Sequence, residues 1–157
     1  MKKVSKESKE ASKEAATEDG SNQQEKQVKS EEPASRVDIS LLYPLWNPFD
    51  SWVGLESPIT IEEVQTAIKN QDTIGEHNKN PHKPQPREYH IRRIAWFTQH
   101  TDWEPIVLEC GWPEYDVEPY LQDGNHRLAA AIVLGHKWIY AHCSGVVSEI
   151  ESFLYKP

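Results

Sequence analysis

The chain has 157 residues and a formal net charge of −8, with 25 acidic side chains against 17 basic ones. That length suits one domain. The second part of the chain has no run of basic residues, so the composition argues against the clustered positive surface that holds duplex DNA. No segment is long and apolar enough to cross a membrane, and the first residues lack the apolar core of a secretory signal. We therefore expect a soluble, cytoplasmic protein that does not bind duplex DNA.

Residues 1–38 differ in composition from the rest. They are rich in Lys, Glu, Ser, Gln and Ala and contain no Trp, Tyr or Phe. Such a segment cannot bury enough apolar surface to offset its chain entropy. We predict a disordered, charged tail over residues 1–38, which could order on a protein partner. One domain should follow over residues 39–157, where all 6 Trp, 6 Tyr and 3 Phe lie.

The first half of this domain predicts two helices. Residues 38–54 mix apolar residues with Pro and turn formers, which is typical of irregular chain or a short strand. Thr60 and Glu63 have the spacing of a capping box, and the apolar residues that follow share one helical face, so residues 61–70 should be helical. A Pro-rich loop is expected over residues 75–88, and a second helix over residues 88–100.

The second half alternates strands and helices. We predict a buried strand over residues 106–110, a second strand over 120–124, a helix over 125–135 that Gly135 ends, a third strand over 137–143 and a short helix after it. This order is typical of a mixed α/β (α+β) domain with a short sheet packed by helices. Cys110 and Cys143 form no CxxC pattern and are expected to be free, buried thiols.

The segment "YLQDGNHRLAAAIVLG" crowds Asn125, His126 and Arg127 onto the first turn of a helix. The first backbone N–H groups of a helix have no intrahelical partner, and the helix dipole makes that end mildly positive. Gly124 would let a ligand approach the backbone closely, while an arginine and an imidazole add donors for phosphate oxygens. Asp123 could bind a metal ion carried by the phosphates, accept a hydroxyl proton, or fix its neighbours.

A second interpretation of the same residues stays open. Asp123 or Asn125 could simply cap the helix, and Arg127 could pair with a surface carboxylate. Short motifs of this kind often occur without any ligand.

Taken together, "EPIVLE", "YLQDGNHRLAAAIVLG" and "KWIYAHC" resemble the ParB/sulfiredoxin superfamily over about residues 88–143. The resemblance implies a small α/β fold whose motif loop holds nucleotide phosphates. Members include a CTP-binding partition protein, an ATP-dependent sulfinic-acid reductase, a free-serine kinase and proteins described as nucleases.

Departures from the superfamily patterns narrow these expectations. Sulfiredoxin has a cysteine immediately before its His-Arg pair, where this chain has Asn125, so reductase chemistry is not expected. Few residues follow Cys143, whereas partition proteins continue into a helix-turn-helix region. The serine-kinase branch resembles the chain best, at "DG-x-x-R". The resemblance implies that Asp123 is catalytic together with an upstream glutamate, for which Glu88 is the closest candidate and Glu76 and Glu104 compete.

Two function classes follow from the motif. In the first, the protein is an enzyme that binds a nucleoside di- or triphosphate with Mg²⁺ and hydrolyses it or transfers its phosphoryl group to a small-molecule acceptor. Gly124, Asn125, His126 and Arg127 would hold the phosphates, and Asp123 would act as base or metal ligand. In the second, a non-catalytic binding or adaptor module engages a protein through its tail. A nuclease, with Asp123, Glu104 and Glu109 around a metal, is a third alternative.

Overall fold

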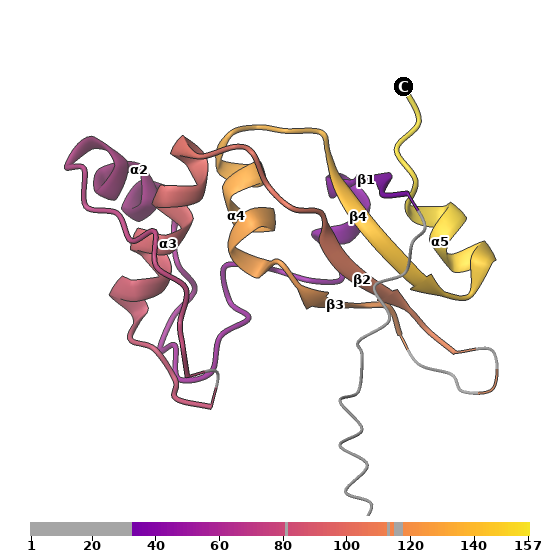
Figure 1. The fold of residues 1–157 in the computed structure, drawn as a ribbon, viewed down its shortest axis with the longest axis horizontal. Helices are drawn as coiled ribbons and strands as arrows, with labels where there is room; N and C mark the ends of the chain where they lie inside the picture. The colour runs from indigo at the N-terminus through magenta and orange to yellow at the C-terminus, as the bar shows by residue number, and fades with distance from the viewer. Residues whose placement is uncertain (1–32, 81, 113, 115–117) are drawn as a thin grey trace, which may run out of the picture.

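The computed structural model describes residues 33–80, 82–112, 114 and 118–157. Over these residues the chain forms a four-stranded mixed sheet and five helices, which confirms the predicted mixed α/β class (Figure 1). The expected tail lies outside the described residues as far as residue 32. Among the residues described, no helix has the length and apolar character needed to span a membrane.

The sheet has the strand order β1-β4-β2-β3. Its strands are β1 (Ser35–Asp38), β2 (Ile106–Cys110), β3 (Tyr120–Asp123) and β4 (Trp138–Gly145). The two central strands, β2 and β4, run parallel, while each outer strand is antiparallel to its neighbour. Val107 near the start of β2 pairs with Asp123 at the end of β3. The DGNHR motif therefore leaves the sheet beside the point where β2 enters it.

Three of the five helices form successive layers on the sheet. The five helices are α1 (Ile39–Leu42), α2 (Ile61–Lys69), α3 (Arg87–Gln99), α4 (Asn125–Val133) and α5 (Val147–Phe153). Figure 1 shows α4 between the sheet and α3, with α2 beyond α3, whereas α5 lies at the opposite side beside β4. As a result α4 is packed from two directions.

Helix α4 takes part in two apolar cores. Leu128 and Ala131 belong to a core with the sheet, and Ala129 and Ala130 belong to a core with α2 and α3. Alanine side chains are short, so both neighbours can approach the helix backbone closely. Gly135 ends the helix as predicted: its φ is 72°, and the next N–H donates to the Ala131 carbonyl at 2.9 Å. The helix that carries the motif at its start is therefore held by packing on both sides.

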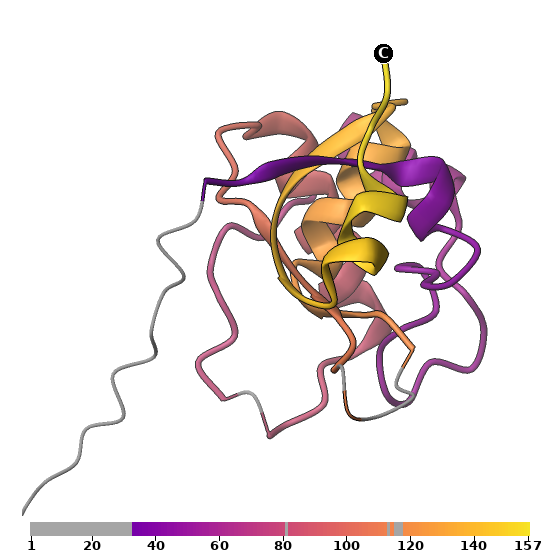
Figure 2. The same ribbon diagram turned by 90° about the vertical axis from the view of Figure 1, so that its right-hand side faces the viewer.

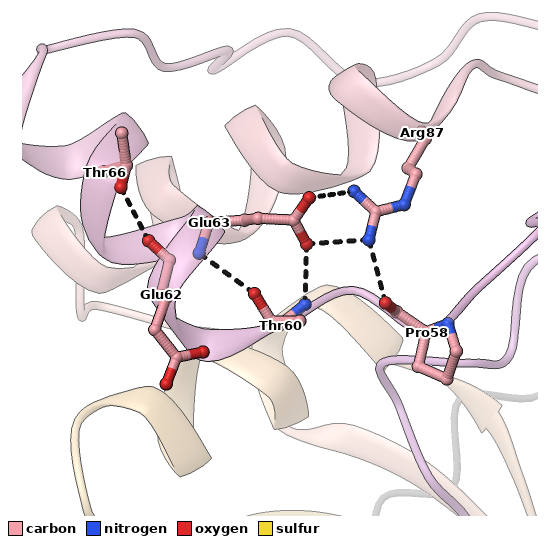
Figure 3. Close-up of polar contacts among 6 residues, drawn as sticks. All are labelled: Pro58, Thr60, Glu62, Glu63, Thr66 and Arg87. Atoms are coloured by element: carbon pink, nitrogen blue, oxygen red, sulfur yellow. Dashed lines mark hydrogen bonds and ion pairs between the residues drawn. The ribbon is translucent and has the colours of Figure 1, made fainter.

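The capping box predicted at the start of α2 is present (Figure 3). The Thr60 hydroxyl accepts from the Glu63 N–H at 3.2 Å, and the Glu63 carboxylate accepts from the Thr60 N–H at 2.9 Å. Arg87 at the start of α3 donates to the same carboxylate and to the Pro58 carbonyl. The cap thus also ties α2 to α3. With this arginine beside it, the pKa of Glu63 falls to about 2.

The boundary predicted between tail and domain is wrong by four residues. Ser35–Asp38 lie in the predicted tail but form β1, in which Val37 is fully buried. Asp38 then caps α1 by accepting from the Ser40 N–H at 2.8 Å. Figure 2 shows β1 continuing directly into α1, near α5. A strand this short, with one buried apolar residue, gives no periodic signal and forms because β4 supplies its partners.

Candidate functional site

A cavity of about 640 Å³ opens at the start of α4. Its walls come from the loop before β2, the end of β3, the first turn of α4 and the last turn of α3. Fourteen residues line it: Trp52, His77, Trp96, Phe97, His100, Asp102, Trp103, Glu104, Gln122, Asp123, Gly124, Asn125, His126 and Arg127. The whole predicted DGNHR motif therefore lies in one cavity.

Helix α4 begins in this cavity without a side-chain cap. Its N-cap is Gly124, with φ 111° and no side-chain hydrogen bond to the helix. The first intrahelical bond runs from the Leu128 N–H to the Gly124 carbonyl at 2.9 Å. The N–H groups of Asn125, His126 and Arg127 precede that bond and have no partner inside the helix. Neither Asp123 nor Asn125 caps the helix, which removes one part of the alternative interpretation.

Glycine at position 124 is required for two reasons. The left-handed backbone conformation disfavours any residue with a Cβ atom. A Cβ atom built there would also lie 2.5 Å from Cγ2 of Ile106, a fully buried side chain of β2. The turn is therefore pressed against the sheet, and the backbone of the first helical turn is fixed.

Arg127 is buried, and its guanidinium donates three hydrogen bonds to other groups of the protein. Its Nη1 donates to the carbonyls of Glu104 at 2.7 Å and Pro105 at 3.0 Å, and its Nη2 donates to Oδ2 of Asp123 at 2.6 Å. The guanidinium thus holds the loop before β2 against α4. Of the two interpretations of Arg127, the structure shows the pairing with an exposed carboxylate, Asp123, and adds the two backbone carbonyls as partners; the phosphate-binding role stays a prediction.

Asn125 is also engaged. Its Oδ1 accepts a hydrogen bond from Nε1 of Trp46 at 2.7 Å. Trp46 lies just after α1, more than seventy residues away in the sequence, so no local pattern indicates this contact. The bond ties the first turn of α4 to the segment that follows α1.

His126 forms a hydrogen-bonded pair with His90 of α3. Nδ1 of His90 lies 3.0 Å from Nε2 of His126. The indole of Trp52 stacks on both rings, with centroid distances of 4.3 and 4.7 Å, and Tyr89 meets both edge-on. Three rings from two other parts of the chain therefore hold His126 at the cavity wall.

Both imidazoles of this pair are neutral near pH 7. Burial lowers the pKa of His90 to about 4. The pKa of His126 is lowered to about 3, chiefly by burial and in addition by the nearby His90, Arg93, His77 and Arg127. His126 therefore adds no positive charge beside a phosphate at neutral pH, although a neutral imidazole keeps one N–H donor.

Three carboxylates line the cavity: Asp102, Glu104 and Asp123. The Asp123 side chain is 67% exposed, although one of its oxygens is bound by Arg127. Because Arg127 is already paired with Asp123 and His126 is neutral, the three carboxylates give the cavity an acidic lining. A bare anion would meet unfavourable electrostatics here.

The structure does not bring Glu88 to Asp123. Glu88 is exposed and lines a different cavity, between α2 and α3, together with Glu62 and Glu63. Of the competing glutamates, Glu104 shares the cavity with Asp123, whereas Glu76 does not line it. Residues 88 and 90 point to different sides of α3. The side with His90 faces α4, whereas Glu88 points away from α4.

The three carboxylates predicted for a nuclease do not lie together at one site. Glu109 is buried beside β4, where it accepts from the Ser144 hydroxyl at 2.7 Å, and it pairs across the sheet with Tyr120 rather than Asp123. Within residues 33–157, excluding those not described, no group of three or more His, Cys, Asp or Glu residues is arranged to hold a metal ion. Cys110 is a buried free thiol as predicted, and the free Cys143 is half-buried.

The main residues that sequence reasoning missed are His90, Trp52 and Trp46. His90 had a detectable signal, because it lies four residues before the buried Ile94 and so shares its helical face. Trp52 and Trp46 lie in irregular chain, where no periodicity indicates which side chains turn inward.

Comparison of the chain with protein-family models, with curated proteins and with solved structures finds no match.

Proposed function

We propose that the protein binds a nucleoside di- or triphosphate at the start of α4. The observation that carries the proposal is the uncapped first turn of α4, which opens into the 640 Å³ cavity. Three N–H groups without intrahelical partners, at the positive end of a helix, are suited to phosphate oxygens. The tight packing of Gly124 on Ile106 fixes these donors before any ligand arrives.

The acidic side chains of the cavity support a divalent cation as part of the ligand. Mg²⁺ uses one or two protein carboxylates and completes its shell with water and phosphate oxygens. Asp123 fits this requirement, because its carboxylate is largely exposed and adjoins the helix start. When bound, the cation would neutralise the phosphates. Asp102 and Glu104 add negative potential on the same wall.

The aromatic side chains of the cavity support a nucleoside rather than inorganic phosphate. Trp52, Trp96, Phe97 and Trp103 all line it. Aromatic faces stack on bases without strong preference for one base. Trp103 is held in place because its Nε1 donates to the Phe97 carbonyl at 3.0 Å.

We further propose that the bound nucleotide is hydrolysed or gives its phosphoryl group to a small acceptor. Asp123 is the candidate base, and Glu104 takes the place expected for the upstream glutamate, since it shares the cavity. Phosphoryl transfer depends mostly on positioning and charge stabilisation, which a fixed helix start provides. This activity is what the resemblance to the free-serine kinase branch implies.

Thermal unfolding with a panel of nucleotides, each with and without Mg²⁺, tests the proposal. One nucleotide should raise the unfolding temperature, and more so with Mg²⁺. A ligand at about 100 times its Kd stabilises a folded protein by about 2.7 kcal/mol. Asp123→Asn should keep nucleotide binding but remove the Mg²⁺ enhancement and any turnover. Identical melting with every nucleotide would reject the site.

A non-catalytic binding module is the second candidate. Two observations favour it: Arg127 is occupied by backbone carbonyls, and its third bond engages the proposed base. Such a module would bind the nucleotide without consuming it. Product analysis by chromatography after prolonged incubation with the stabilising nucleotide separates the two candidates.

A further inference from the structure

His100 ends helix α3 at the edge of the cavity, and its ring is held against the helix. Its backbone N–H and its ring Nδ1 lie 3.1 and 2.9 Å from the Trp96 carbonyl oxygen. The imidazole also stacks on the Trp96 indole, with ring centroids 4.1 Å apart and planes inclined by 12°. Both side chains line the cavity. The ring of His100 is therefore fixed in orientation, although the residue is exposed to solvent.

The bond to the Trp96 carbonyl decides which ring nitrogen of His100 carries the proton. A carbonyl oxygen can only accept, so Nδ1 is the donor. A neutral imidazole has a single N–H, and a proton on Nδ1 leaves Nε2 with a lone pair. The in-plane directions of the two nitrogens diverge widely, so Nε2 points away from the end of α3. In the described part of the chain no group hydrogen-bonds to this nitrogen, and it is open to a ligand.

The neighbouring groups of the cavity leave the task of proton removal to this nitrogen. His100 shares the cavity with Asp102, Glu104 and Asp123. Asp123 is the proposed Mg²⁺ ligand, and one of its oxygens already accepts from Arg127. A carboxylate bound by a cation is a weak base, because the cation favours its charged form. Mg²⁺ takes oxygen ligands and so leaves an imidazole nitrogen free. Imidazole is also the side-chain group that most often acts as a general base.

We propose that His100 is the general base of the phosphoryl transfer and that its Nε2 takes the proton of the attacking hydroxyl or water. The inference rests on the proposed function and divides its tasks: Asp123 holds the cation, and His100 takes the proton. As the attacking oxygen bonds to the terminal phosphorus, its O–H proton moves to Nε2, and the bond from phosphorus to the bridging oxygen breaks. The nucleotide leaves with that electron pair and one phosphate fewer. The imidazolium then releases the proton to solvent, to which His100 is exposed.

Long-range ¹⁵N–¹H correlation spectra of the histidine rings, recorded on the full chain, test the tautomer. A pH of about 8 is suitable, because an imidazole in a model peptide is neutral there. His100, assigned by the loss of its signals in His100→Asn, should show a protonated Nδ1 and an unprotonated Nε2. A protonated Nε2 in the parent chain would overturn the proposal.

Conversion of ATP, GTP, CTP and UTP and of the matching diphosphates, each with Mg²⁺, tests the role of Nε2. His100→Asn keeps an amide donor near the Trp96 carbonyl but has no basic nitrogen. It should slow the conversion by about 100-fold or more, while the rise in unfolding temperature with nucleotide stays the same. His77→Asn is the matched control, since it removes a second histidine from the same cavity and should keep the parent rate.

Added imidazole separates a missing base from a distorted site. His100→Ala leaves room where the ring stood, so free imidazole should restore part of the rate in this variant and leave the rate of His77→Asn unchanged. Conversion by His100→Asn at the parent rate would overturn the proposal, and so would a nucleotide that the parent chain binds but never converts. No response to any nucleotide would reject the proposed function and the base role together, while the spectrum would still decide which nitrogen of His100 carries the proton.

Discussion

Arg127 is the single side chain on which the geometry of the cavity most depends. It supplies donors to two backbone carbonyls and one carboxylate, and it joins the loop before β2 to α4. A buried carbonyl without its donor costs about 1–3 kcal/mol. We predict that Arg127→Ala lowers the free energy of unfolding by about 2–4 kcal/mol, with two carbonyls affected, and weakens ligand binding at the same time.

Urea unfolding of Arg127→Ala, Arg127→Lys and Arg92→Ala checks this prediction. Lysine cannot reproduce a planar fork, so Arg127→Lys should recover only part of the loss. Arg92 pairs with Asp72 on the surface, and Arg92→Ala should cost less than about 1 kcal/mol. If the two alanine variants were equally stable, the bracing role of Arg127 would be refuted.

The buried histidines make stability depend on pH in a defined direction. The pKa values of His90 and His126 are about 4 and about 3 in the folded chain, whereas an unfolded histidine titrates near 6.5. As pH falls below about 6.5, only the unfolded state gains these protons. Stability should therefore be full above pH 6.5 and decline toward pH 4, by up to about 1.4 kcal/mol per pH unit for each histidine.

Urea unfolding between pH 7.5 and 4.5 measures this decline. The low pKa of Glu63, about 2, costs stability as pH falls through its ordinary value of 4.5, so it contributes only at the acidic end of this window, and equally in all variants. His126→Asn should reduce the slope by about one proton, while His136→Gln, at an exposed position, should leave it unchanged. A slope that is the same in all three proteins would contradict the burial of the pair.

At the scale of elements, the capping box of α2 offers a measurable contribution. Thr60→Ala removes the acceptor for the Glu63 N–H, and loss of such a cap typically costs about 1 kcal/mol. Thr66→Ala is the matched control, because its exposed hydroxyl only donates back to the Glu62 carbonyl (Figure 3). Equal chemical denaturation midpoints for the two variants would mean that the cap contributes nothing.

Elements with local signals could be predicted from the sequence, and elements that depend on distant partners could not. The capping box located α2, apolar periodicity located α3 and α4, and short, largely apolar stretches located β2 and β4. By contrast, β1 exists because β4 pairs with it. The site shows the same division: the motif at the start of α4 was visible, but the acceptors of Arg127 are main-chain carbonyls of Glu104 and Pro105, which carry no side-chain signature.

At the scale of the whole molecule, two truncations locate the true start of the domain. A chain that begins at Pro33 retains β1, and by composition residues 1–32 add little apolar area, so its melting temperature should stay within a few degrees of the full chain. A chain that begins at Ile39 loses the burial of Val37, worth about 1.5–3 kcal/mol. It also loses the bond from the Tyr155 N–H to the Arg36 carbonyl.

Circular dichroism melts of the two truncated chains and the full chain make the comparison. The chain from Ile39 should melt well below the chain from Pro33. Equal melting of both would show that β1 adds nothing to the sheet, and a large loss in the chain from Pro33 would show that the first 32 residues contribute to the fold.

The pairing of Ser35 with Ala141 has a consequence for biosynthesis. Strand β1 must wait for its partner until about a hundred further residues have been made, and at about 5–20 residues per second this takes several seconds. Helices α2 and α3 can associate during that interval, since their contacts are close in sequence. The sheet, whose contacts are long-range, can close only after β4 has been made. Until then Val37 and its neighbours are exposed to other chains and to chaperones, so nascent copies of this protein are most vulnerable to misassociation at their amino-terminal strand.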